Sequence, residues 1–228
     1  MNDDARTDDG RLSPVDPAMS AHRRLAAGRR RLAALALATL LAGCAAVQPP
    51  KSELQTLYVL AAQPLPKAAA PVHDAVIEVT TPRAWPGFGT ARIAYVRRPY
   101  EVDYYAASRW ADTPARMLQP LLARALEQTA GFRAVVVAPG IVPADLRLDT
   151  ELVRLQQDFT ARPSRMEITL HAQLVDVGAK RVIATRVFDE VEDAPHEDAD
   201  GGVVAANAAL QRLLGQVADF CIAQARRR

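Results

Sequence analysis

Residues 100–132, YEVDYYAASRWADTPARMLQPLLARALEQTAGF, change their periodicity part-way along and thereby indicate the kind of fold. The first part alternates polar and apolar residues and is rich in aromatic side chains, which is typical of a strand. From Thr113 onward apolar residues recur at helical spacing, with Pro114 at the first helical position and Gly131 at the end. These residues predict a strand followed directly by an amphipathic helix, which Pro120 should kink.

The sequence on either side of this stretch continues the same two patterns. Alternating segments predict strands, and Gly178 followed by Ala179 predicts the turn of a hairpin between the last two. An apolar stripe predicts a final helix, and the acidic segment before it, 189–202, predicts a solvated loop. We therefore expect an α+β fold, a largely antiparallel β-sheet with two amphipathic helices packed on one face. The further strands are expected over residues 75–80, 91–96, 133–137, 145–159, 165–177 and 180–192, and the final helix over 203–225.

The beginning of the chain has the three parts of a secretory signal. A basic segment precedes the apolar run Leu32–Leu41, and a small Ala-Gly pair then leads to Cys44. The apolar run has roughly ten residues, whereas a helix that crosses a membrane needs about 20. A buried cysteine on an Ala/Leu helix is the alternative interpretation, but it leaves the upstream arginines unexplained. We expect translation to start at Met19, which would give the signal an ordinary length.

The four residues Leu41-Ala42-Gly43-Cys44 resemble the lipobox of bacterial lipoproteins, in which a peptidase cuts before the cysteine and the new N-terminal residue carries acyl chains. Small side chains let the backbone enter the peptidase, and the thiol accepts the diacylglycerol. Ala45 stands where an aspartate tends to retain enterobacterial lipoproteins in the inner membrane, so the expected location is the periplasmic face of the outer membrane. The predicted organisation is a lipoprotein signal peptide over 1–43, an acylated cysteine with a Pro- and Ala-rich tether and one short strand over 44–71, and an α+β domain over 72–228.

Composition and charge fit one domain with a core, or one domain plus a tail. Half of the 228 residues are hydrophobic and the formal net charge is +2, so the chain can bury a core. After residue 43 basic and acidic residues are equal in number, which argues against a nucleic-acid partner. Once Cys44 is acylated, Cys221 has no disulfide partner, and its place on the apolar stripe of the last helix predicts a small buried hydrophobe.

Motifs for catalysis or metal binding are not found in the sequence. The segment GAKR at Gly178 is no nucleotide-binding loop, and a G-x-S-x-G elbow is absent. Glu167 and His171 share a predicted strand face but stand roughly 13 Å apart, too far to bind one metal ion. Asp198 and Asp200 resemble the start of a calcium loop that lacks its closing acid. We therefore predict that the protein is not an enzyme and has no metal or other cofactor.

The lipobox, LYVL, VIEV, ARIAYV and the opening stretch follow one another in an order that resembles the ABC-type transport auxiliary lipoprotein family. The most specific part is the tyrosine-rich strand that leads to Arg109, Trp110 and Asp112, with the Leu-rich helix after it. The resemblance implies a lipoprotein that accompanies an MCE-domain lipid transporter, whose ATPase and permease are separate chains. It implies the MCE-domain protein as partner and brings no set of catalytic residues.

The role implied is that of an outer-membrane-anchored auxiliary component in the transport of phospholipid or other apolar compounds between membranes, as a single chain or a homo-oligomer. Trp110 is expected to pack the first helix onto the sheet, and Arg109 to pair with an acid such as Asp112 or Glu101. Contact of these positions with the MCE-domain partner is the alternative. The aromatic residues between 85 and 110 leave the same choice, core packing or a surface for lipid or a partner. A lipoprotein regulator of an envelope enzyme, such as a peptidoglycan synthase activator, is the alternative function.

Overall fold

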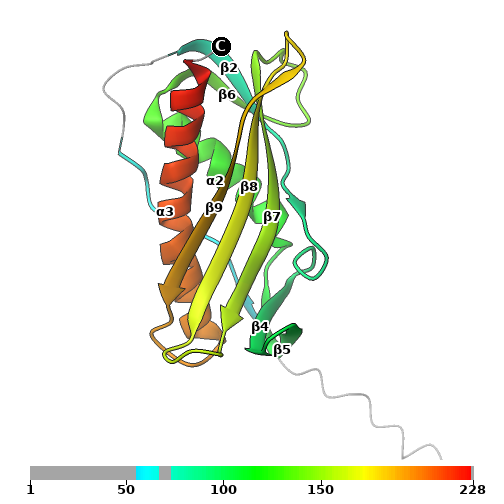
Figure 1. Ribbon diagram of the computed structural model, residues 1–228, viewed down its shortest axis with the longest axis vertical. Coiled ribbons are helices and arrows are strands. Elements are labelled where there is room, and N and C mark those ends of the chain that lie inside the picture. Colours follow the sequence, from blue (N-terminus) through cyan, green and yellow to red (C-terminus); the bar gives the residue numbers. More distant parts are fainter. Residues whose placement is uncertain (1–54, 67–72, 227–228) are drawn as a thin grey trace, which may run out of the picture. The chain divides into compact units, whose positions relative to one another are not determined.

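Two helices cover one face of a mixed β-sheet in the computed structural model, which describes residues 55–66 and 73–226 (Figure 1). The predicted signal peptide, Cys44 and most of the predicted tether lie outside the described residues. The predicted α+β class with its two helices on one face is confirmed. In chain order the described elements are β1 (Thr56–Tyr58), β2 (His73–Val79), β3 (Arg83–Ala84), β4 (Arg92–Arg98), β5 (Glu101–Trp110), α2 (Pro114–Thr129), β6 (Phe132–Val137), β7 (Leu146–Asp158), β8 (Arg165–Asp176), β9 (Arg181–Asp193) and α3 (Ala199–Ala225).

Strand β7 is the centre of the sheet. One of its edges pairs antiparallel with β8, and β8 pairs antiparallel with β9, so the longest ladders have the expected direction. The other edge of β7 is shared, in parallel, by β2, β3 and β4 at successive positions. β6 then flanks β2, whereas β5 and β1 flank β4. Alternation in a sequence tells which face each side chain occupies, but it does not tell the direction of the neighbouring strand.

The strands β7 and β8 keep a strict division between a core face and an open face. The five residues predicted for the inner face of β8 are all buried, from Met166 to Leu174. Strand β7 contains a bulge, because Leu152 pairs with Leu170 while Arg154 pairs with Thr169. Leu152 and Leu155 are three residues apart and would face opposite sides of a regular strand. The extra residue of the bulge puts both in the core and leaves Arg154 on the open face.

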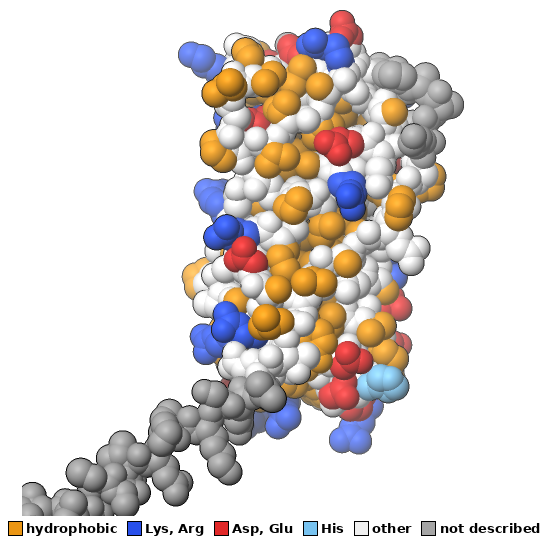
Figure 2. Space-filling view, turned by 180° about the vertical axis from the view of Figure 1, so that it is seen from behind, with side chains coloured by type: hydrophobic (Ala, Val, Ile, Leu, Met, Phe, Trp, Pro, Cys, Tyr) orange, Lys and Arg blue, Asp and Glu red, His pale blue; other side chains and the backbone are white. Residues whose placement is uncertain are grey.

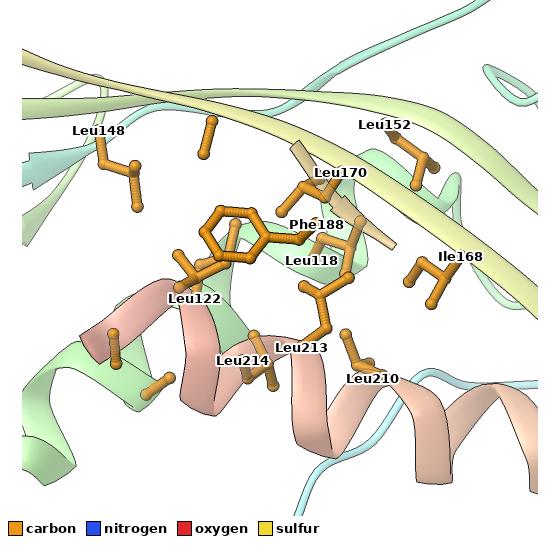
Figure 3. Packing of buried hydrophobic residues seen from close by; sticks show 14 of the residues in the cluster. Leu118, Leu122, Leu148, Leu152, Ile168, Leu170, Phe188, Leu210, Leu213 and Leu214 are labelled. Atoms are coloured by element: carbon orange, nitrogen blue, oxygen red, sulfur yellow. The ribbon is translucent and has the colours of Figure 1, made fainter. Parts of the chain in front are cut away.

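The core lies between this sheet and the two helices (Figure 3). Full burial of one aliphatic or aromatic side chain contributes roughly 1.5–3 kcal/mol, so these contacts dominate the stability of the domain. Cys221 of α3 is also fully buried, where burial raises the pKa of its thiol to about 12. The labelled core residues are Leu118 and Leu122 of α2, Leu210, Leu213 and Leu214 of α3, and Leu148, Leu152, Ile168, Leu170 and Phe188 of the strands.

The helix ends correct two details of the sequence prediction. Helix α2 begins at Pro114 as expected, but the residue with left-handed backbone at its end is Ala130, with φ 49°, and not Gly131. Gly131 is needed for close packing instead, since a Cβ there would lie 2.5 Å from Cγ1 of Ile222 in α3. Helix α3 begins at Ala199, inside the predicted acidic loop, because the side chain of Asp198 accepts a hydrogen bond from the Gly201 N–H and caps the helix.

Candidate functional site

Strand β5 carries Arg109 and Trp110, two of the residues singled out in the sequence, and backbone hydrogen bonds fix its end on both sides. Trp110 is 1 % exposed and belongs to the core shared by the sheet and the helices. Its backbone N–H donates to the carbonyl of Ala91 beside β4, and the next N–H, of Ala111, donates to the carbonyl of Tyr58 in β1. The tryptophan therefore fixes the point at which the sheet passes into helix α2.

The ion pair expected for Arg109 is not the one that forms. Asp112 pairs with Arg116 at 3.1 Å, and Glu101 pairs with Arg98 at 3.0 Å. The first pair is local, because Arg116 lies in the first turn of α2 and Asp112 immediately precedes the N-cap Thr113. Arg109 is exposed, and its Nη1 donates to Oε1 of Gln55 at 3.5 Å.

A hollow of about 490 Å³ lies beside this arginine. Strand β5 is irregular there, because Ala94 pairs with Tyr104 whereas Arg92 pairs with Arg109, so β5 has three more residues than β4 between the two pairs. Such irregularities re-aim side chains and are common next to binding sites. The hollow is lined by Gln55, Thr90, Ala91, Arg92, Tyr104, Tyr105, Ala106, Ser108 and Arg109.

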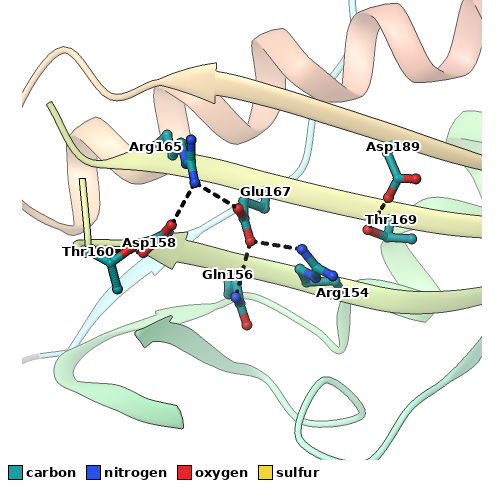
Figure 4. Close-up of polar contacts among 8 residues, drawn as sticks. All are labelled: Arg154, Gln156, Asp158, Thr160, Arg165, Glu167, Thr169 and Asp189. Atoms are coloured by element: carbon teal, nitrogen blue, oxygen red, sulfur yellow. Dashed lines mark hydrogen bonds and ion pairs between the residues drawn. The ribbon is translucent and has the colours of Figure 1, made fainter. Parts of the chain in front are cut away.

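The open face of the sheet carries a connected set of charged and polar side chains (Figure 4). Glu167 accepts hydrogen bonds from Arg154 at 3.0 Å and from Gln156 at 3.2 Å, and it lies 3.6 Å from Arg165. Arg165 also donates to Asp158 at 3.1 Å. These contacts tie β7 to β8, and they occupy the carboxylates rather than leaving them free for chemistry.

The pKa of Asp158 shows the balance of forces in this set. Burial alone would raise the pKa, but hydrogen bonds from Thr160 and Arg165 outweigh burial and lower it. Glu167 and His171, considered above as a ligand pair, have separate partners, since His171 Nδ1 lies 4.0 Å from Glu151. In the described part of the chain, no group of three or more His, Cys, Asp or Glu side chains is arranged to hold a metal ion.

The first described segment, residues 55–66, crosses from the sheet to the helices, and we call it the strap. Its β1 portion pairs in parallel with β5. Beyond β1 three alternate backbone N–H groups of the strap donate to side-chain amides of the two helices, and Leu60 is buried in the core. The bonds run from Ala61 to Asn207 (3.0 Å), from Gln63 to Gln211 (2.7 Å) and from Leu65 to Gln128 (2.7 Å).

Alternate N–H groups of the strap donate hydrogen bonds, as they would in an edge strand of a sheet. Here the acceptors are side-chain amide oxygens of the helices instead of backbone carbonyls. A groove of about 620 Å³ runs between its residues 61–63 and α3. Figure 2, the view from behind relative to Figure 1, shows hydrophobic side chains in a broken stripe along the face that it presents. The strap contacts were not predicted from the sequence, although Asn207 and Gln211, four apart on a helix rich in alanine, were a usable signal.

Comparisons with known proteins agree with the geometry. The model of the ABC-type transport auxiliary lipoprotein component family matches residues 58–218. The chain is similar to the crystal structure of protein XCC0632 from Xanthomonas campestris, with 22% identity over 75% of this chain and 98% of that chain and a TM-score of 0.69. A second crystal structure, of an uncharacterized protein, has 15% identity over 73% of this chain and 98% of that chain and a TM-score of 0.57. At these identities the likeness shows the fold. No protein with a curated description matches the chain.

Proposed function

The chain belongs to the family of ABC-type transport auxiliary lipoproteins, and from this premise we propose that it is the outer-membrane-anchored adaptor of an MCE-type transporter. In this role it catalyses no reaction of its own. It holds a folded domain in the periplasm, docks the MCE-domain protein, and so links the outer membrane to a route for phospholipid or other apolar compounds.

The strap is the structural observation that supports this role. The family match begins at Tyr58, so residues 58–66 of the strap fall within the matched region. Hydrogen bonds from the strap reach β5, α2 and α3, which are the motif strand and both helices. A force applied through the tether is therefore distributed over these three elements and does not act on one terminal strand alone.

The length of the tether sets where the domain works. With Cys44 acylated, eleven peptide units separate it from Gln55, and an extended chain spans at most about 3.6 Å per residue. The strap then starts within roughly 40 Å of the membrane surface. Among the described residues no helix is both long and apolar enough to cross a membrane, and the acyl chains on Cys44 are the proposed anchor.

Membrane fractionation in an enterobacterial host tests the anchor. We expect the wild-type chain in the outer-membrane fraction, the variant Ala45→Asp in the inner-membrane fraction, and the variant Cys44→Ala, which can be neither acylated nor cut at this site, absent from the outer-membrane fraction. All three proteins keep the same folded domain, so the comparison isolates the N-terminal residues. Wild-type protein in the inner-membrane fraction would contradict the proposed location.

Genetic epistasis in the native host tests the role in transport. Deletion of the gene for this chain should raise the sensitivity of the cells to detergent as much as deletion of the gene for the partner permease does. The double deletion should be no worse than either, because both proteins act on one route. A double deletion that is clearly worse, or a defect confined to peptidoglycan, would favour the regulator of an envelope enzyme instead.

A further inference from the structure

Two arginine side chains stand opposite each other where β4 and β5 pair, and among the described residues no carboxylate forms an ion pair with either. Arg92 and Arg109 are register partners, and both are exposed. Side chains directly opposite in an antiparallel pair have Cβ atoms roughly 4.5–5.5 Å apart, a distance at which like charges destabilise a sheet. Neither arginine makes an ion pair with a described residue. Asp112, the acid three residues after Arg109, pairs with Arg116 instead.

Neutral groups hold both guanidinium groups in place at the rim of the hollow. The guanidinium of Arg92 lies over the ring of Tyr104, 3.7 Å from its centroid, and the hydroxyl of Tyr104 donates to the Gly87 carbonyl at 3.0 Å. Arg109 is held by Gln55, whose own Nε2 donates to the Ala106 carbonyl at 3.2 Å. Each guanidinium has five N–H donors, so most of them remain available to a ligand.

We infer that the hollow between Arg92 and Arg109 is a binding site for a phosphoryl group. A tetrahedral oxyanion accepts paired hydrogen bonds from planar guanidinium groups, and its charge would remove the repulsion between the two arginines. The hydroxyls of Ser108 and Thr90 line the same hollow and can donate to the remaining oxygens. The volume of about 490 Å³ exceeds what one phosphate ion needs, which leaves room for the group that the phosphate carries.

The phosphoryl group has two sources, a free phosphate compound or the headgroup of an anionic phospholipid. Gln55, the described residue nearest in sequence to the proposed anchor at Cys44, lines the hollow. Lipid headgroups would then be within the reach of the tether. This inference stands apart from the proposed partnership with an MCE-domain protein, and it is tested without that partner.

The test uses the full acylated chain in a non-ionic maltoside detergent at constant ionic strength set with chloride. Two probes are titrated separately, inorganic phosphate and micelles that contain phosphatidylglycerol, while NMR follows the Nε–Hε signals of the arginines. The double variant Arg92→Gln/Arg109→Gln removes the site. The variant Arg124→Gln/Arg181→Gln is the matched control, because these arginines are exposed, make no ion pair with a described residue and lie outside the hollow.

We expect the signals of Arg92 and Arg109 to shift in the wild type and in the control, and the apparent affinity to fall at least about tenfold in the double variant. A response to both probes supports a general phosphoryl site, a response to the micelles alone assigns it to a lipid headgroup, and a response to phosphate alone assigns it to a free compound. No shift with either probe, or equal binding by the double variant, would overturn the inference. The single variants, which remove one charge each, guard against misfolding and should each weaken binding by an intermediate amount.

Discussion

Removal of one amide side chain should release the strap locally while the domain stays folded. In the variant Gln211→Ala the N–H of Gln63 loses its acceptor, which lies at 2.7 Å in the wild type. A neutral hydrogen bond contributes roughly 0.5–1.5 kcal/mol net, and this one is exposed, so water replaces part of the loss. Since about 1.4 kcal/mol corresponds to a factor of ten, the amide of Gln63 should exchange about two to ten times faster with solvent.

Hydrogen exchange followed by NMR or by mass spectrometry of a peptide from the strap measures this effect. Neighbouring amides of the strap, at Ala61 and Leu65, should change less, because Asn207 and Gln128 still accept their bonds. Amides in the middle of α3 should not change, because a local opening leaves the core intact.

The matched control is Gln216→Ala on the same helix. Gln216 donates to Glu190 of β9 and forms no hydrogen bond with the described strap residues, so its loss should leave the exchange of Gln63 unchanged. Two results would refute the reasoning. Equal exchange of Gln63 in wild type and in Gln211→Ala would show that the strap is not held by this bond, and uniform acceleration along the chain would show that the strap does not open as a separate unit.

Three further perturbations follow from burial and charge. Trp110→Ala should lower the free energy of unfolding by about 3–5 kcal/mol, whereas Trp85→Ala, at a half-exposed site, should cost far less; chemical denaturation measures both. Cys221 should resist Ellman's reagent in the native state, because burial raises its pKa to about 12 and shields the sulfur, and it should react on unfolding; fast labelling of folded protein would contradict its placement. Asp158→Asn should lower the melting temperature most at neutral pH. A carboxyl with a lowered pKa contributes stability above about pH 4 and loses this contribution as the pH falls through its folded pKa. A difference in melting temperature between wild type and variant that stays constant down to pH 2 would contradict the assignment.

The local patterns that follow from side-chain spacing could be predicted from the sequence. The inner face of β8, from Met166 to Leu174, the start of α2 at Pro114 and the burial of Cys221 all depend on periodicity and on local chemistry. The family could also be predicted, from a resemblance carried mainly by the strand that leads to Arg109 and Trp110, and the family model matches residues 58–218.

Features that depend on contacts between distant segments could not be predicted. The parallel pairing of β4 with β7 joins residues about sixty positions apart, and no local signal encodes it. The opposition of Arg92 and Arg109 depends on the irregular register of β5, which alternation alone does not reveal. Ala130 took the left-handed position at the end of α2 because Gly131 was required one residue later, where α3 approaches.

The central claim is that this chain is an adaptor of an MCE-type transporter, and co-purification from the native envelope tests it most directly. The full acylated chain would be crosslinked in cells, extracted in mild detergent and purified through a tag at its C-terminus, with Cys44→Ala as the control that lacks the proposed anchor. We predict that wild-type protein brings down an MCE-domain protein as its main crosslinked partner and that the unanchored variant brings down much less. Recovery of the wild-type chain without an MCE-domain protein, or with a peptidoglycan synthase in its place, would contradict the account.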